Sequence, residues 1–441
     1  MLRFNENNEV IREEQYRAIL VGLQRDEDIS YSMEELKGLA EAAGAEVLGQ
    51  MVQNLEKPNT ATLIGKGKVE ELAEMVKNME ADTVIFNDEL TGMQLRNLED
   101  AAGVRVIDRT ILILDIFAAR ASSKEGKLQV ELAQLQYRMP RLTGFGKSLS
   151  RLGGGIGTRG PGEKKLETDR RHIEKRMYDI KSELAQIKNT RGVQRARREK
   201  SEIPVVALVG YTNSGKSALM NRLLSMSEKE DKTVFEKNML FATLDTQQRS
   251  VTLDTNHQFI LVDTVGFVSR LPHSLVNSFK ATLEEVAYAD LLLHVVDSSY
   301  ENHDFHIEVT NKVLEEIGAG DKEKIMVFNK IDLAADSSSV LPVAGEDNIY
   351  ISAKYGRNIE ELIDLIKSKI FRDMIRAKLL VPYTRGDISS YLCENATVFE
   401  MKYTDSGTWF DAELKSADYQ RLKEYEVIYY GSQSGPGRTD Y

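Results

Sequence analysis

Residues 205–217 combine an apolar run with a turn rich in glycine, and together they can bind phosphate groups. The run is followed by the pattern Gly-x-x-x-x-Gly-Lys-Ser, made of Gly210, Tyr211, Thr212, Asn213, Ser214, Gly215, Lys216 and Ser217. A helix is expected directly after it. In such a strand–loop–helix unit, backbone N–H groups and the helix N-terminus surround the phosphates. Lys216 would then contact the β- and γ-phosphates, and the Ser217 hydroxyl would coordinate Mg²⁺.

A second motif indicates which base accompanies the phosphates. An apolar strand ends in Asn329, Lys330, Ile331 and Asp332. The Asp332 carboxylate can accept hydrogen bonds from guanine N1–H and from its 2-amino group, whereas adenine would leave it unpaired. Asn329 supports the base edge, the Lys330 stem covers the ring, and Ser352, Ala353 and Lys354 form the remaining base loop. The sequence therefore predicts GTP and GDP, and not ATP, as ligands.

Two segments between these motifs resemble the switches of Ras-like GTPases. The strand at 259–262 runs into Asp263-Thr264-Val265-Gly266. Asp263 is expected in the Mg²⁺ shell, and the Gly266 N–H is expected on the γ-phosphate. In the first switch, Thr243 is expected to complete the Mg²⁺ coordination, with Thr246 as the alternative. Lys216, Thr243 and Gly266 are the expected catalytic groups.

The mechanism depends on three further residues. Phe267 occupies the position where many signalling GTPases have a water-orienting glutamine, and a phenyl ring cannot hydrogen-bond to water. Hydrolysis is therefore expected to be slow until a partner, another side chain or ordered backbone positions the water. Asn213 could help to hold a monovalent cation or could only stabilise its own loop. His273 is a candidate base, although a histidine on the switch surface is the simpler interpretation.

The amino-acid composition limits which classes of protein this chain can belong to. The 441 residues are 41% hydrophobic and 29% charged, and no apolar run approaches the length of a membrane span. There is no signal-peptide core near Met1, and the single Cys393, expected to be a semi-buried small hydrophobe, excludes an internal disulfide. A cytoplasmic monomer without a membrane span is therefore expected.

Charge is unevenly distributed along the chain. The net charge is −11, yet residues 138–200 hold 18 Lys and Arg against 7 Asp and Glu, a local charge of +11. One basic segment in an acidic protein is typical of a chain that contacts a polyanion.

The pattern of elements predicts four parts. Residues 1–110 alternate strands and helices, which indicates an N-terminal α/β subdomain with a parallel sheet. The loop 65–68 opens a helix there and could hold an anion, but a plain turn explains it as well. The Ras-like G domain spans 201–373. A small α+β domain with a hairpin around residues 405–407 spans 374–441.

Residues 111–200 are expected to form a long antiparallel two-helix hairpin. Apolar residues recur at helical seam spacing, with Ile113 and Phe117 at the start and Leu128, Leu132, Leu135, Met139, Leu166, Ile173, Met177, Ile180, Leu184 and Ile187 further along. The Gly-rich loop 144–162 joins the helices and carries Lys147, Arg151 and Arg159. Glycine permits close approach to a phosphate backbone and arginine supplies donors, so RNA contact is predicted; a linker is the alternative.

Several of these segments together resemble the HflX family of ribosome-associated GTPases. They are residues 151–163 (RLGGGIGTRGPGE), 166–171 (LETDRR), 210–217 (GYTNSGKS), 263–267 (DTVGF) and 381–387 (VPYTRGD). The resemblance covers nearly the whole chain. It implies binding of the large ribosomal subunit near its catalytic centre and rescue or splitting of stalled ribosomes under stress. It also implies GTP hydrolysis that the ribosome stimulates.

The first switch departs from the family pattern. The family has a sequence close to Thr-Leu-Asp-Pro-Thr-Thr-Arg, where this chain has TLDTQQR at 243–249. Two other functions stay open: a GTPase that assists RNA modification or ribosome assembly, and an ATP-dependent RNA remodeller that uses the N-terminal domain.

Overall fold

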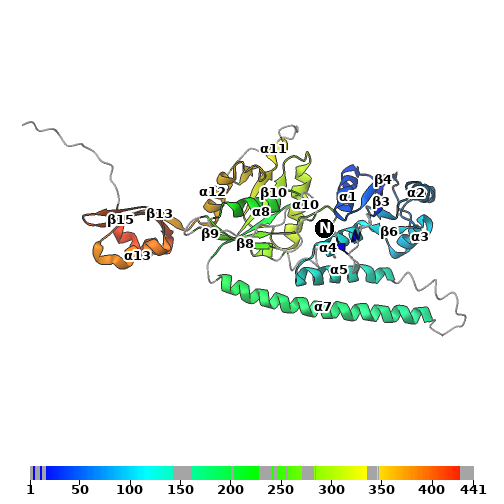
Figure 1. The fold of residues 1–441 in the computed structure, drawn as a ribbon, viewed down its shortest axis with the longest axis horizontal. Coiled ribbons are helices and arrows are strands. Elements are labelled where there is room, and N and C mark those ends of the chain that lie inside the picture. The colour runs from blue at the N-terminus through cyan, green and yellow to red at the C-terminus, as the bar shows by residue number, and fades with distance from the viewer. Residues whose placement is uncertain are drawn as a thin grey trace, which may run out of the picture.

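The computed structural model describes residues 3–4, 10–11, 16–142, 161–199, 203–227, 241, 247–253, 257–270, 283, 285–334, 345 and 347–427. In Figure 1 the G domain lies between the N-terminal unit on one side and a small C-terminal unit on the other, and a long helix runs beneath the first two. A two-residue pairing of β1 (Arg3–Phe4) with β2 (Val10–Ile11) precedes these parts.

The N-terminal unit is a parallel sheet in the order β4-β3-β5-β6. Alternate residues of the central strand β3 face opposite sides, so Ala18 and Leu20 pack under one helix pair and Ile19 and Val21 under the other. The predicted βαβα class is confirmed. The elements are β3 (Arg17–Gln24), α1 (Ser30–Ala42), β4 (Glu46–Asn54), α2 (Lys66–Met79), β5 (Thr83–Phe86), α3 (Gly92–Ala102), β6 (Arg105–Asp108) and α4 (Arg109–Arg120).

The glycine-containing loop before α2 is an ordinary helix start. Gly65 is the N-cap, and its N–H donates to Gln53 Oε1 at 2.8 Å. The Gly65 N–H is therefore already hydrogen-bonded to Gln53 and does not point to an anion site.

Helix α4 corrects one expectation about the hairpin. Ile113 and Phe117 are buried against α1 and the N-terminal sheet and do not lie in the hairpin seam. Asp108 caps α4 by accepting from Ile111 N at 3.0 Å, so the helix starts directly at the end of β6. Helical spacing alone cannot distinguish packing in the hairpin seam from packing on the N-terminal sheet, because either arrangement buries one apolar face.

The hairpin consists of α5 (Lys124–Leu142) and α7 (Pro161–Glu199). Leu128, Leu132 and Ile180 form a small buried cluster, and Leu135, Met177, Leu184 and Ile187 pack around it. Arg176 of α7 pairs with Glu131 of α5, and the later Arg191 pairs with the earlier Glu125, so the two helices run antiparallel as predicted. The side chain of Leu166 lies outside the described residues.

The G domain has six strands in the order β12-β11-β10-β7-β9-β8, and only β8 runs antiparallel to its neighbour. Helices α8 and α12 cover one face, and α10 packs on the other. This is the predicted P-loop fold. The elements are β7 (Val205–Val209), α8 (Lys216–Ser225), β8 (Gln247–Thr252), β9 (Gln258–Asp263), β10 (Leu291–Asp297), α10 (His303–Glu316), β11 (Lys324–Asn329), α11 (Ile331–Ala334), β12 (Asn348–Tyr350) and α12 (Ile359–Ile370).

One apolar core continues from the N-terminal unit into the G domain. Tyr211, Val265 and Val268 belong to the same buried cluster as helices α1 and α4. Phe117 of α4 also meets Phe241 edge to face, with 4.6 Å between ring centroids. The two units therefore share packing instead of being joined only by a linker.

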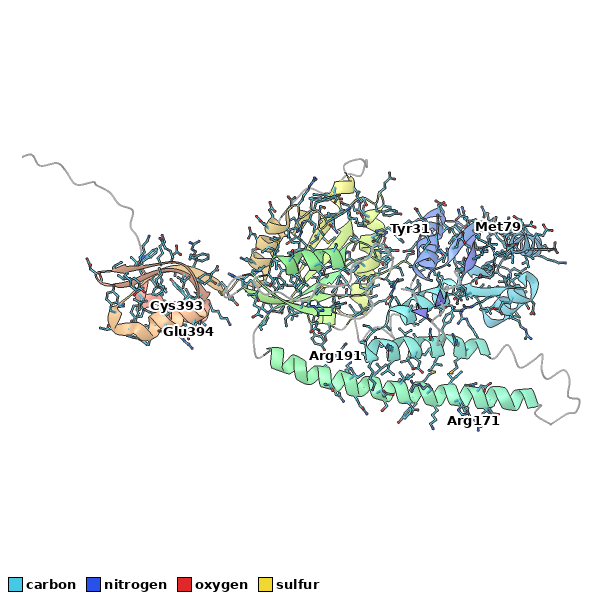
Figure 2. The ribbon with its side chains drawn as sticks, viewed as in Figure 1. Tyr31, Met79, Arg171, Arg191, Cys393 and Glu394 are labelled. Atoms are coloured by element: carbon cyan, nitrogen blue, oxygen red, sulfur yellow. The ribbon has the colours of Figure 1, made fainter. Side chains whose placement is uncertain are left out.

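The C-terminal unit is an antiparallel sheet in the order β13-β15-β14, packed on short helices. Cys393, labelled in Figure 2, is exposed and is not the semi-buried residue that we expected. Leu392 and Ile388 fill the inner face of its helix, so Cys393 points outward. The elements are β13 (Met374–Val381), η2 (Tyr383–Arg385), α13 (Gly386–Asn395), β14 (Thr397–Thr404), β15 (Gly407–Lys415), α14 (Ser416–Leu422) and η3 (Lys423–Tyr425).

Among the described helices, none is both long enough and apolar enough to cross a membrane.

Candidate nucleotide site

The loop between β7 and α8 needs glycine at both ends. Gly210 has φ +144°, and a Cβ there would lie 2.2 Å from the Val295 carbonyl oxygen. Gly215 has φ +94°, and a Cβ there would lie 2.2 Å from Asn329 Nδ2. Any other side chain would push β10 or the Asn329 loop away, which explains why the pattern requires glycine at these two positions.

Lys216 begins α8 and is buried beneath the loop. Its Nζ donates to the Gly210 carbonyl at 3.0 Å and to the Tyr211 carbonyl at 2.8 Å. Burial lowers the pKa of the Lys216 amine to about 8, although the Asp263 carboxylate acts in the opposite direction. The loop carbonyls thus hold the amine where phosphate oxygens would meet it.

Ser217 and Asp263 bring two oxygen ligands together. The Ser217 hydroxyl donates to Asp263 Oδ2 at 2.8 Å, and Asp263 is fully buried at the end of β9. Mg²⁺ prefers oxygen ligands and, in nucleotide sites, takes few of them from the protein. These two residues fit such an ion, and the described residues hold no group of three His, Cys, Asp or Glu that would form another metal site.

The segment after β9 lies against the phosphate-binding loop. A Cβ on Gly266 would come within 2.6 Å of Thr212 Cα and 3.1 Å of Lys216 Nζ. Next to it, Thr212 N–H donates to the Phe267 carbonyl at 2.6 Å and Phe267 N–H donates to the Gly210 carbonyl at 3.2 Å. The second switch and the loop are therefore joined through their backbones at this point.

The Phe267 side chain points away from this junction. It is buried in the apolar core under α10, near Val209 and Val262. The ring therefore has a packing role, which agrees with the expectation that it does not orient water.

Asn329 connects three loops of the predicted base site. Its Nδ2 donates to the Ser214 carbonyl at 2.9 Å, and its Oδ1 accepts from Ala353 N–H at 3.0 Å. Lys330 pairs with Asp297 at 2.7 Å, and Ser352 donates its hydroxyl to Asp332 Oδ1 at 2.6 Å. Lys354 is exposed beside Tyr355. Asn329, Lys330, Asp332, Ser352 and Ala353 thus lie together at the ends of β11 and β12.

Asn213 is exposed at the outer turn of the loop, with φ +60°. A cleft of about 510 Å³ opens beside it, between α1 and the G domain, and Tyr31, Glu34 and Tyr300 are among the residues that line it. Tyr31 lies on the side of the N-terminal unit that faces the G domain (Figure 2).

Some predicted site residues cannot be placed. Thr243, Thr246 and His273 lie outside the described residues, and so do Lys147, Arg151 and Arg159 of the Gly-rich loop. In the altered first switch, the two glutamines begin β8, and Gln248 Nε2 donates to Glu285 Oε2 at 3.1 Å.

Sequence reasoning missed three buried residues next to the loop. Glu35 of α1, Arg109 of α4 and Ser269 form a polar cluster with the Tyr211 hydroxyl. The sequence motif places Tyr211 only in the phosphate-binding loop. A charged residue on the apolar face of each helix was the available signal, but nothing in the sequence pairs residues so far apart.

Three family models together match most of the chain. Residues 30–118 match a model described as GTP-binding GTPase N-terminal, residues 120–198 match GTP-binding GTPase Middle Region, and residues 205–330 match 50S ribosome-binding GTPase.

Curated relatives agree with these matches. The GTPase HflX of Caldanaerobacter subterraneus subsp. tengcongensis is 48% identical over 419 residues, which cover 95% of this chain and 96% of the relative. The GTPase HflX of Escherichia coli is 38% identical and covers 93% of this chain and 96% of its own length. A solved GTP-binding protein from Sulfolobus solfataricus, in complex with GDP, is 27% identical with a TM-score of 0.43 and covers 81% of this chain and 99% of its own. Given the two relatives named GTPase HflX and the matched family models, the chain belongs to the HflX family of GTPases, which hydrolyse GTP to GDP and phosphate.

Proposed function

We propose that GTP binds between the phosphate-binding loop and the Asn329 loop, and that this site serves a reaction on the large ribosomal subunit. The description of the model matched by residues 205–330, 50S ribosome-binding GTPase, carries the second half of the proposal. The full-length relatives named GTPase HflX support it.

In the proposed site, residues 210–217 surround the phosphates with backbone N–H groups, and Lys216 neutralises charge on the β- and γ-phosphates. The Gly266 N–H contacts the γ-phosphate. Support comes from the short separation between Gly266 and the Lys216 amine, since one phosphate oxygen can accept from both.

Guanine is recognised by Asp332, with Asn329, Lys330, Ser352, Ala353 and Lys354 around it. The contact from the Ser352 hydroxyl keeps the Asp332 carboxylate in one orientation. That orientation lowers the entropic cost of accepting both guanine donors.

Ser217, Asp263 and Thr243 would hold Mg²⁺, which offsets the negative charge that builds up on the phosphates. Asn213, exposed at the outer turn of the loop, would contribute to a monovalent cation site. Because the Phe267 ring is packed in the core, the attacking water needs another group to orient it. We propose that the ribosome provides that organisation.

The basic hairpin is the proposed ribosomal contact. Arg171, labelled in Figure 2 in the first part of α7, is exposed, and the Gly-rich loop that precedes α7 in the sequence carries Lys147, Arg151 and Arg159. Positive charge at this end would bind ribosomal RNA phosphates. Through this contact the protein would split or rescue stalled ribosomes in the cytoplasm under stress.

GTP turnover with and without purified large ribosomal subunits tests the proposal. We expect a slow basal rate and a clear increase with large subunits, because the chain itself lacks a water-orienting side chain after Gly266. Small subunits at the same concentration are the control. Equal rates in all three reactions would reject stimulation by the ribosome.

A further inference from the structure

Tyr211 connects the phosphate-binding loop to the N-terminal unit. Its hydroxyl donates to Glu35 Oε1 on α1 and accepts from Ser269 N–H at 2.7 Å. Its ring stacks on His306 with 3.9 Å between centroids. One side chain of the loop therefore contacts both the second switch and a different folding unit.

Glu35 is held in place from the N-terminal side. Arg109 forms an ion pair with Glu35 Oε2, and its guanidinium also donates to Asn87 Oδ1 at 3.1 Å and to the Ser269 carbonyl at 3.2 Å. The Ser269 hydroxyl in turn donates to Glu35. Two helices of the N-terminal unit thus hold the main-chain and side-chain atoms of one switch residue.

The cluster is buried, so its bonds are costly to lose. The exposed fractions of Glu35, Arg109, Tyr211 and Ser269 are 6%, 2%, 3% and 4%. Burial, and secondarily the charge of Glu35, raises the pKa of the Tyr211 phenol, so the hydroxyl keeps its proton and remains a donor. A buried donor or acceptor that loses its partner is no longer compensated for its lost contact with water, so removal of one member of the cluster destabilises the others.

Two residues along the chain separate this cluster from the expected γ-phosphate contact. Ser269 follows Phe267, whose backbone is bonded to Gly210 and Thr212, and Gly266 lies against Thr212 near the Lys216 amine. A shift of Ser269 therefore displaces the backbone that positions the Gly266 N–H.

We propose that Glu35 is a positioning residue for GTP: acting through Tyr211 and Ser269, it holds the second switch where the Gly266 N–H can reach the γ-phosphate. This rests on the proposed γ-phosphate contacts of Gly266 and Lys216. The switch pays less conformational entropy when GTP binds, because the N-terminal unit has already ordered it.

The coupling is reciprocal. If the N-terminal unit favours GTP over GDP, then GTP must tighten the contact between α1 and the G domain by the same factor. GDP has no γ-phosphate and gains nothing from a positioned Gly266. A loss of affinity for GTP but not for GDP would therefore indicate that the cluster positions the switch. A role only in holding the two units together would affect both nucleotides equally.

Three conservative variants test the proposal in the full chain. Glu35→Gln keeps the side-chain shape, Tyr211→Phe removes one oxygen and keeps the ring on His306, and Ser269→Ala removes one hydroxyl. Glu74→Gln, at an exposed glutamate on α2 of the same unit and outside the cleft, is the matched control. Affinities for GDP and for a non-hydrolysable GTP analogue are measured by calorimetry, and thermal unfolding checks the fold.

We expect Tyr211→Phe and Glu35→Gln to lower the affinity for the GTP analogue by about tenfold, which is within the usual range of coupling between sites. The affinity for GDP should change by less than about twofold. Hydrogen exchange in α1 should be slower with the analogue than with GDP in the unmodified protein. That difference should disappear in Tyr211→Phe. Glu74→Gln should behave as the unmodified protein in both measurements.

Other outcomes overturn the proposal. Equal losses for both nucleotides would give the cluster a purely structural role, and unchanged affinities in all three variants would remove its influence on the site. Tighter binding of the analogue by the variants would mean that Glu35 holds the second switch in a conformation that disfavours GTP. Absence of guanine nucleotide binding in the unmodified chain would instead refute the proposed nucleotide site.

Discussion

Opposing influences act on the Lys216 amine. Burial under the phosphate-binding loop lowers its pKa to about 8, while phosphate oxygens need its charged form. Bound nucleotide would stabilise the ammonium, so the pKa in the complex must be higher than in the free protein. Binding and proton uptake are therefore linked at this single residue.

Proton uptake on GDP binding measures that linkage. With a pKa of about 8, roughly half of the amines are neutral at pH 8 and about a tenth at pH 7, so binding should take up about 0.5 and 0.1 proton. Calorimetry in two buffers of different ionisation enthalpy gives these numbers. Above pH 8, GDP affinity should fall with rising pH. Binding at pH 8 without proton uptake would show that the buried amine stays charged in the free protein.

Asp332 should decide the choice of base. In Asp332→Asn, the amide cannot accept from both guanine donors, so GDP affinity should fall about a hundredfold or more. ATP affinity, measured in the same titrations, should be weak before and after the change. If ATP bound the unmodified protein as tightly as GTP, Asp332 would not determine the specificity of this site.

The stability of helix α7 depends on a small number of buried contacts. It spans 39 residues, yet its buried contact with α5 centres on Ile180, which has 0% exposure and packs on Leu128 and Leu132. A lone helix of polar composition is marginally stable in water, so this seam must supply much of its stability.

Ile180→Ala tests that dependence. Loss of the buried side chain should cost about 2 kcal/mol or more, which corresponds to about thirtyfold faster hydrogen exchange in the middle of α7. Tyr178→Ala is the control on the same helix, because Tyr178 is 74% exposed. If both variants exchanged at the same rate, the Ile180 cluster would not be what orders the hairpin.

At the scale of the whole molecule, charge is divided between an acidic body and a basic hairpin. Residues 138–200 carry +11 in a chain of net charge −11. The long α7 carries this charge along the N-terminal unit and beneath the G domain, as Figure 1 shows. Such a separation would let the hairpin approach RNA while the rest of the protein remains soluble.

Charge reversal tests this division. Lys147→Glu, Arg151→Glu and Arg159→Glu together should weaken pelleting with ribosomes and flatten its salt dependence, because fewer phosphates are neutralised, and GTP binding should not change. Reversal of the exposed Lys37, Lys57 and Lys77 in the N-terminal unit makes the same change in net charge and is the control. Identical pelleting of both triple variants would show that total charge, and not this loop, sets the affinity.

The sequence alone determined the parts that depend on neighbours along the chain. Gly210, Gly215, Lys216 and Asn329 were identified because backbone conformation and strand ends are local properties, and the structure brings them together at one edge of the sheet. Alternating strands and helices likewise predicted the parallel sheet of the N-terminal unit.

Only the tertiary structure decided which surfaces meet. Tyr211 and Glu35 are 176 residues apart, and Phe117 packs on Phe241 of the G domain instead of in the hairpin seam. Helical spacing says that one face is buried but not against what, because any apolar surface satisfies it. The link between the N-terminal unit and the second switch therefore became visible only when the chain was folded.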